Sequence, residues 1–145
     1  MFHTILVPTD GSEHAQKAVL AAVDFAKASH GKVIGLSVAE PYPFSPLAET
    51  GGFPDPLSYE RATLKMVQRF VEKVADAANK AGVPCETVTA MDADPAGQIL
   101  KTADRYGCDA IFMATHGRHG LNKLILGSVT EGVLLNSPVP VVVYR

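Results

Sequence analysis

The sequence predicts an α/β domain with a mainly parallel, five-stranded open sheet covered by helices on both faces. Five short apolar runs suited to buried strands alternate with four segments whose apolar residues recur at helical spacing. Parallel neighbours need crossover connections, and a helix between each pair of consecutive strands supplies them. With 145 residues, 47% of them apolar and 19% charged, the chain is expected to form one globular domain over residues 1–145.

The first part of the chain predicts a strand, a helix and a second strand. Residues 4–8 are branched and uncharged, as in a buried strand. Ser12 is placed to cap a helix, and Gly31 to end it in a left-handed turn. The apolar positions of this helix are Ala15, Ala18, Val19, Ala22 and Ala26. Residues 33–39 are the second predicted strand.

Residues 41–57 contain five of the ten prolines and a Gly-Gly pair, so they predict a long loop. A lid, a partner contact and a disordered insertion are equally compatible with this composition. A long helix is then expected from Ser58 to about Ala81, where Gly82 ends it. One stripe of this helix is apolar and consists of Val67, Phe70, Val71, Val74, Ala78 and Ala81.

The second half of the chain continues the alternation. Residues 85–90 predict a strand, and Asp94 and Pro95 mark a helix start as the cap and the first helical residue. The apolar run 110–114 predicts the fourth strand. A helix is expected from about Ser128 to Asn136, and a terminal strand completes the sheet.

Charge and composition exclude several functional classes. The chain has 13 basic and 15 acidic side chains, a net charge of -2, which argues against a nucleic-acid-binding protein. No apolar run approaches the roughly 20 residues of a membrane helix. The first residues do not resemble a signal peptide, so we expect a cytoplasmic protein. Cys85 and Cys108 are therefore expected to be free thiols.

Polar, glycine-containing segments follow two of the predicted strands: Thr9-Asp10-Gly11 and Thr115-His116-Gly117. Parallel sheets bind ligands beyond the carboxyl ends of their strands, where the winding reverses. If these two strands are neighbours, both segments therefore face one crevice. Asp10 is then placed to accept hydrogen bonds from a ribose or to hold a metal, or else it belongs to an ordinary Asp-Gly turn.

The second segment continues with the spacing A-x2-G-x9-G-S, formed by Ala114, Gly117, Gly127 and Ser128. Without a β-carbon, both glycines allow positive φ and a close approach of the backbone to an anion. The N–H groups of Val129 and Thr130 lie at the positive end of the next helix. Alternatively, the glycines are only turn residues, and Ser128 is an N-cap that forms a capping box with Glu131. His116 and His119 lack the further ligands of a metal site.

Three segments together resemble the universal stress protein family: ILVPTDGSEHAQKAV, DPAGQILKTADRYGCDAIFMATHGRHGLNKLILGSVTEGVL and SPVPVVVYR. The resemblance implies an adenine nucleotide alpha hydrolase-like fold with strand order 3-2-1-4-5. It also implies a homodimer joined through the terminal strand, Val139 to Tyr144. Members that bind ATP carry the motif G-x2-G-x9-G-[ST], and this chain has Ala114 in place of its first glycine.

The resemblance implies a bound adenine nucleotide, ATP or AMP, with or without Mg²⁺. Asp10 resembles the ribose or adenine contact, and Pro8, Thr9 and Val38 would flank the base. The phosphate-side loop would consist of Met113, Ala114, His116, Gly117 and Arg118, followed at the helix start by Gly127, Ser128, Val129 and Thr130.

The expected function is that of a dimeric, nucleotide-binding stress-response or signalling protein with at most slow ATP hydrolysis. No activated base or arginine clamp can be assigned, so we do not expect a fast phosphoryl-transfer enzyme. A nucleotide-independent dimeric interaction module of the same fold is the main alternative. A true ATP-dependent enzyme is a third hypothesis.

Overall fold

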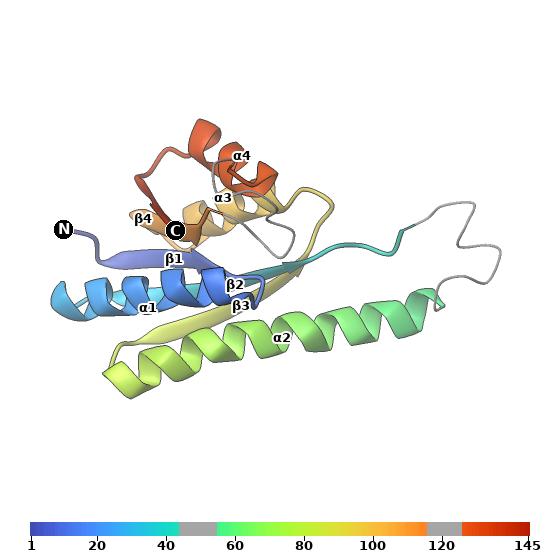
Figure 1. Cartoon of the computed structure of the whole chain (residues 1–145), viewed down its shortest axis with the longest axis horizontal. Helices are drawn as coiled ribbons and strands as arrows, with labels where there is room; N and C mark the ends of the chain where they lie inside the picture. Colours follow the sequence, from blue (N-terminus) through green and yellow to red (C-terminus); the bar gives the residue numbers. More distant parts are fainter. Residues whose placement is uncertain (44–54, 116–125) are drawn as a thin grey trace.

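The computed structural model describes residues 1–43, 55–115 and 126–145 and has the predicted alternation of strands and helices (Figure 1). The elements are β1 (Thr4–Pro8), α1 (Glu13–Ala28), β2 (Lys32–Ala39), α2 (Pro56–Ala81), β3 (Cys85–Met91), α3 (Pro95–Arg105), β4 (Ala110–Ala114), α4 (Ser128–Asn136) and β5 (Val141–Tyr144). The strands pair in parallel in the order β3-β2-β1-β4-β5. The predicted fold class and the strand order implied by the resemblance are confirmed.

Two layers of helices cover the sheet, with α1 and α2 on one face and α3 and α4 on the other (Figure 1). Alternate residues of each strand point to opposite faces. Ile5 therefore packs in the cluster that contains residues of α1 and α2, whereas Leu6 packs with Ile99 of α3 and Val133 of α4. No helix within the described ranges combines the length and the apolar character needed to cross a bilayer.

The end of α1 differs from the prediction. The residue with positive φ is His30, at 56°, and not Gly31. Gly31 has another reason to be a glycine, because a β-carbon there would overlap the backbone carbonyl of His3. The five apolar positions predicted for this helix are all buried, which confirms its inner face.

Helix α2 begins earlier than predicted. Asp55 is its N-cap and accepts a hydrogen bond from the Ser58 N–H at 3.0 Å. Pro56 occupies the first turn, where its missing N–H costs nothing and its fixed φ suits the helix. The predicted loop 41–57 therefore ends at Asp55, and residues 44–54 of it lie outside the described residues.

The last strand begins at Val141 instead of Val139. The Ser137 hydroxyl donates to the Val139 carbonyl at 2.7 Å and accepts from the Val139 N–H at 3.2 Å, so the chain turns here. Elsewhere, Cys85 is half-buried and Cys108 is buried, and both are free thiols, as predicted.

Candidate functional site

The carboxyl ends of β1 and β4 lie side by side. Strand β1 pairs with β2 on one side and with β4 on the other, where Ile5 lies opposite Ala110. Because successive strands are added in opposite directions from β1, the β1–β4 pair is the reversal point at which α/β sheets bind ligands. The structure therefore brings together the two strand ends that the sequence singled out.

The segment after β1 is a turn held by its own side chains. The Thr9 hydroxyl accepts from the Gly11 N–H at 3.1 Å, and Asp10 Oδ1 accepts from the Ser12 N–H at 2.9 Å. Ser12 then caps α1 as predicted, since its hydroxyl accepts from the Ala15 N–H at 3.1 Å. The Asp-Gly turn considered for Asp10 is present, with φ of 78° at Gly11. It fixes the carboxylate at the end of β1.

Three hydrogen bonds fasten the end of β4 to its surroundings. The Ala114 carbonyl accepts from the Thr130 hydroxyl at 2.9 Å, and the Thr115 carbonyl accepts from the Gly127 N–H at 2.9 Å. The Thr115 N–H donates to the carbonyl of Tyr144 in β5 at 3.0 Å. The first two bonds place the start of α4 directly beside the end of β4.

Helix α4 starts without a side-chain cap from any described residue. Its N-cap is Gly127, and Ser128 is the first helical residue, so the capping box proposed for Ser128 and Glu131 is wrong. The positive φ expected at Gly127 is also wrong. Gly127 has the extended conformation typical of an N-cap, with φ of −61° and ψ of 151°, and its N–H donates to the Thr115 carbonyl. The first-turn N–H groups therefore have no intrahelical partner, and no side chain of the described residues caps them, an arrangement that binds anions.

Apolar residues from both the base side and the phosphate side of the expected site share the α3/α4 face of the sheet. Met113 is buried in the cluster on that face, and Val38 and Val129 are partly buried against it. Pro8 follows Leu6 of the same cluster at a spacing of two residues, so it lies on the same face. These four residues provide an apolar side next to the uncapped start of α4.

The side chain of Ala114 belongs to the opposite face. Residues of β4 alternate between the two clusters: Ala110 and Phe112 pack toward α1, whereas Ile111 and Met113 pack toward α3 and α4. Ala114 continues the first series, so its methyl group points to the α1 layer. The substitution of the first motif glycine therefore adds no atom on the side where α4 begins.

Three expected contacts, His116, Gly117 and Arg118, lie outside the described residues. Within the described ranges, no group of three or more His, Cys, Asp or Glu side chains is arranged to hold a metal ion. The sequence also assigned Phe70 only to the apolar stripe of its helix. The structure places its ring against Gly11 in the turn after β1, a long-range contact that no local pattern predicts.

Comparisons with known proteins agree with this architecture. The model of the universal stress protein family matches residues 1–145. A universal stress protein of Thermus aquaticus is 32% identical over 145 residues, with both chains covered completely. The solved structure of Methanocaldococcus jannaschii MJ0577 is 28% identical, with a TM-score of 0.82 over 99% of this chain and 96% of the other.

Two further solved structures contain an adenine nucleotide. One is a universal stress protein in complex with cAMP, 24% identical, with a TM-score of 0.70 over 98% of this chain and 95% of the other. The second is the Archaeoglobus fulgidus universal stress protein in complex with dAMP, 19% identical, with a TM-score of 0.67 over 99% and 98%. At these identities the similarity is one of fold.

Proposed function

Because the chain belongs to the universal stress protein family, we propose that it binds an adenine nucleotide, ATP or AMP, at the carboxyl ends of β1 and β4. The observation that carries the proposal is the start of α4, which no described side chain caps and which is held against the end of β4. Its first-turn N–H groups suit a phosphate group, because donors and the positive end of the helix dipole act together there.

Each described residue of the site has a distinct role in this proposal. The backbone N–H groups of Ser128, Val129 and Thr130 bind phosphate oxygens. Asp10, fixed by the Ser12 N–H, accepts hydrogen bonds from ribose hydroxyls. Pro8 and Val38 on the α3/α4 face of the sheet, together with Thr9, flank the base. When ATP carries Mg²⁺, the cation offsets the repulsion between the phosphates and Asp10.

The remaining motif positions complete the phosphate side. His116, Gly117 and Arg118 connect the end of β4 to the start of α4 in the sequence. A histidine and an arginine there would supply hydrogen-bond donors and positive charge to the phosphates. Two proteins of this fold hold cAMP and dAMP, which supports an adenine nucleotide as the ligand class.

The proposed biological role is stress response or signalling in the cytoplasm, with the nucleotide as a signal or a stabilising ligand. At a hundredfold excess over its dissociation constant, a ligand that binds only the folded state adds about 2.7 kcal/mol to stability. Among the described residues, no general base is assigned beside Asp10, and we expect ATP hydrolysis to be at most slow. The protein acts as a binding protein and not as a fast enzyme.

The protein is also proposed to form a homodimer through Val139 to Tyr144. Strand β5 is an edge of the sheet and consists of three valines and a tyrosine, none of which is charged. Uncharged edge strands with open backbone groups favour pairing with another strand. Tyr144 is 41% exposed, and Leu135 of the preceding helix α4 is 76% exposed, so apolar surface is available here.

Isothermal titration calorimetry tests the nucleotide proposal. Nucleotide-stripped protein is titrated with ATP and with AMP, each with and without Mg²⁺. We expect saturable binding, and we expect Asp10→Asn to weaken it about tenfold, since a charged hydrogen bond contributes about 1.5–3 kcal/mol. The asparagine keeps an oxygen for the Ser12 N–H. Asp24→Ala, which removes an exposed carboxylate of α1, is the matched control.

Absence of binding at millimolar nucleotide would leave the alternative, a nucleotide-independent dimeric interaction module. Repeated turnover of ATP by the purified protein, abolished in Asp10→Ala, would instead support an ATP-dependent enzyme.

A further inference from the structure

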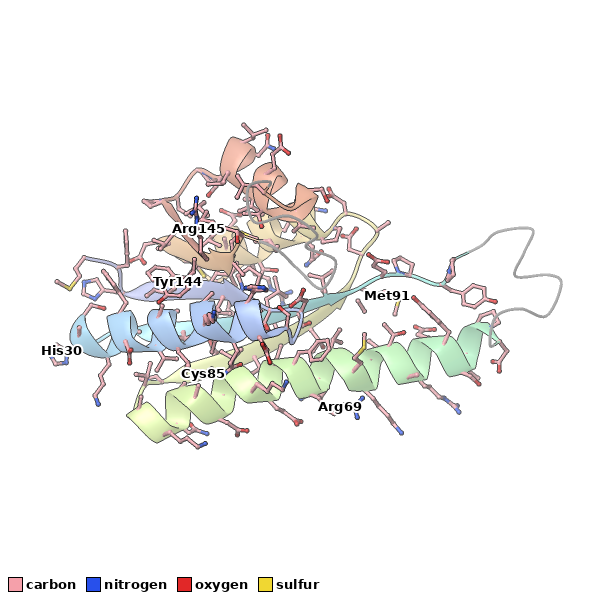
Figure 2. The ribbon with its side chains drawn as sticks, in the orientation of Figure 1. His30, Arg69, Cys85, Met91, Tyr144 and Arg145 are labelled. Carbon is pink, nitrogen blue, oxygen red and sulfur yellow. The ribbon has the colours of Figure 1, made fainter. Side chains whose placement is uncertain are left out.

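The turn that contains Asp10 packs against the aromatic ring of a residue of α2. A β-carbon placed on Gly11 would overlap three ring carbons of Phe70, Cγ, Cδ1 and Cε1. Gly11 also has a φ of 78°, so this position needs glycine both for its conformation and for the close approach. Phe70 is half-buried on the inner side of α2, whereas its neighbour Arg69 is exposed and extends from the outer side of the helix (Figure 2).

A second glycine contact, one helical turn further, sets the position of α2 on the sheet. A β-carbon on Gly35 in β2 would lie 3.0 Å from Cβ and Cγ1 of Val74, which is fully buried. Phe70 and Val74 are four residues apart and therefore lie on the same face of the helix. The contact between Val74 and Gly35 positions α2 on β2. It thereby also determines where the ring of Phe70 contacts the turn after β1.

We propose that Phe70 is a positioning residue for nucleotide binding, which acts by holding the Asp10–Ser12 turn in its binding conformation. The inference rests on the proposed nucleotide site. Phe70 itself belongs to α2, and it acts through the backbone of Gly11. Removing the ring of Phe70 leaves open space next to Gly11, the residue of the turn with the greatest conformational freedom. The turn then populates other conformations. Apparent affinity then falls in proportion to the fraction of molecules in which Asp10 is correctly placed.

The relationship is reciprocal. If Phe70 favours the binding conformation of the turn, a bound nucleotide must in turn favour the packed position of Phe70 by the same free energy. Nucleotide binding is therefore expected to slow hydrogen exchange around Phe70 in the middle of α2 in the wild-type protein. In a variant without the Phe70 ring, nucleotide binding should slow hydrogen exchange in this part of α2 to a smaller extent.

The experiment compares Phe70→Ala with Val71→Ala, each titrated with ATP and Mg²⁺ by calorimetry. Val71 is fully buried in the same helix, while the three atoms nearest to the β-carbon position of Gly11 all belong to Phe70. Both changes should lower stability. Only Phe70→Ala should weaken nucleotide binding, by about tenfold, and Phe70→Leu should recover most of the loss. In nucleotide-free protein, the amide NMR signals of Gly11 and Ser12 should shift in Phe70→Ala and not in Val71→Ala.

The outcomes separate the two proposals. Wild-type affinity in Phe70→Ala, or an equal loss in Phe70→Ala and Val71→Ala, would overturn the positioning role. If the wild-type protein itself does not bind nucleotide, the proposed function fails. The amide signals of Gly11 and Ser12 then decide by themselves whether Phe70 positions the turn. If Phe70→Ala does not fold, Phe70→Leu takes its place, with an expected smaller loss of affinity and a shift of the same two signals.

Discussion

The hydroxyl of Thr130 donates a buried hydrogen bond of 2.9 Å to the backbone carbonyl of Ala114. This bond joins the first turn of α4 to the last residue of β4, and a backbone bond from Gly127 to Thr115 lies beside it. The two bonds hold the start of α4, whose first-turn N–H groups no described side chain caps, at the reversal point of the sheet. The proposed phosphate site therefore depends on a junction between β4 and α4, which are separated by the 13 residues 115–127.

Thr130→Val should destabilise the protein, because the substitution keeps the side-chain shape but leaves the Ala114 carbonyl without its donor. An unsatisfied buried group costs about 1–3 kcal/mol, which urea denaturation followed by circular dichroism would measure. Thr130→Ser keeps the hydroxyl and should lose less. Equal stability of the valine variant and the wild type would show that the bond does not hold the junction.

Ser128→Pro should weaken nucleotide binding while leaving the fold intact. Proline is well tolerated at the first position of a helix, and the extended conformation of Gly127 suits a residue that precedes proline. The substitution removes one backbone N–H and the serine hydroxyl from the proposed phosphate site. Calorimetry with ATP should show a larger loss for Ser128→Pro than for Ser128→Ala, which keeps the backbone donor. Similar affinities of the two variants would argue against backbone binding of phosphate here.

Ala114→Gly should change nucleotide affinity less than about twofold, although it restores the family motif. By the alternation of side chains along β4, the methyl group of Ala114 points to the α1 layer, away from the start of α4. Stability should fall by about 0.5–1 kcal/mol, because glycine in a strand loses more conformational entropy. A tenfold gain in affinity would show that the methyl group obstructs the ligand.

Val143→Pro should dissociate the proposed homodimer. The carbonyls of Pro140 and Tyr144 accept hydrogen bonds from β4, so by alternation the backbone groups of Val141 and Val143 point to the free edge of β5. Proline at residue 143 removes an outward N–H and no bond to β4. Light scattering coupled to size-exclusion chromatography should report a folded monomer.

The matched control for the dimer is Val142→Pro, which removes an N–H that faces β4 and should lower stability instead. A Val143→Pro variant that remains dimeric would place the dimer contact elsewhere.

Stability should fall above pH 9 because of Cys108. Burial, followed by the negative charge of Asp109, raises the pKa of this thiol from 9.0 to about 11. Between these values the thiol ionises in the unfolded chain while it stays protonated in the folded protein. The unfolded state then binds fewer protons, so the free energy of unfolding decreases as pH rises. Each full unit of pKa difference corresponds to about 1.4 kcal/mol.

Urea denaturation at several values from pH 8 to 11, compared with Cys108→Ala, would measure this contribution. The stability advantage of the wild type over the variant should shrink across the window. A constant difference would show that the thiol does not titrate differently in the two states.

Local patterns were sufficient for most elements. The apolar run of β4 and the capping signals of Ser12 and Asp94 predicted these elements because short-range backbone geometry and burial periodicity determine them. Predictions were wrong at two glycines that make contacts with distant residues. The N–H of Gly127 donates to the carbonyl of Thr115, and a β-carbon on Gly31 would overlap the backbone carbonyl of His3.

The sequence by itself determined the alternation of strands and helices, the parallel sheet and the positions of polar residues after β1 and β4. It did so because side-chain periodicity and turn chemistry are properties of neighbouring residues. The tertiary structure decided that these two strands are neighbours, that the methyl group of Ala114 faces away from α4, and that Phe70 supports Gly11. Those relationships depend on packing between elements far apart in the chain, and packing acts only once the sheet and its helices are assembled.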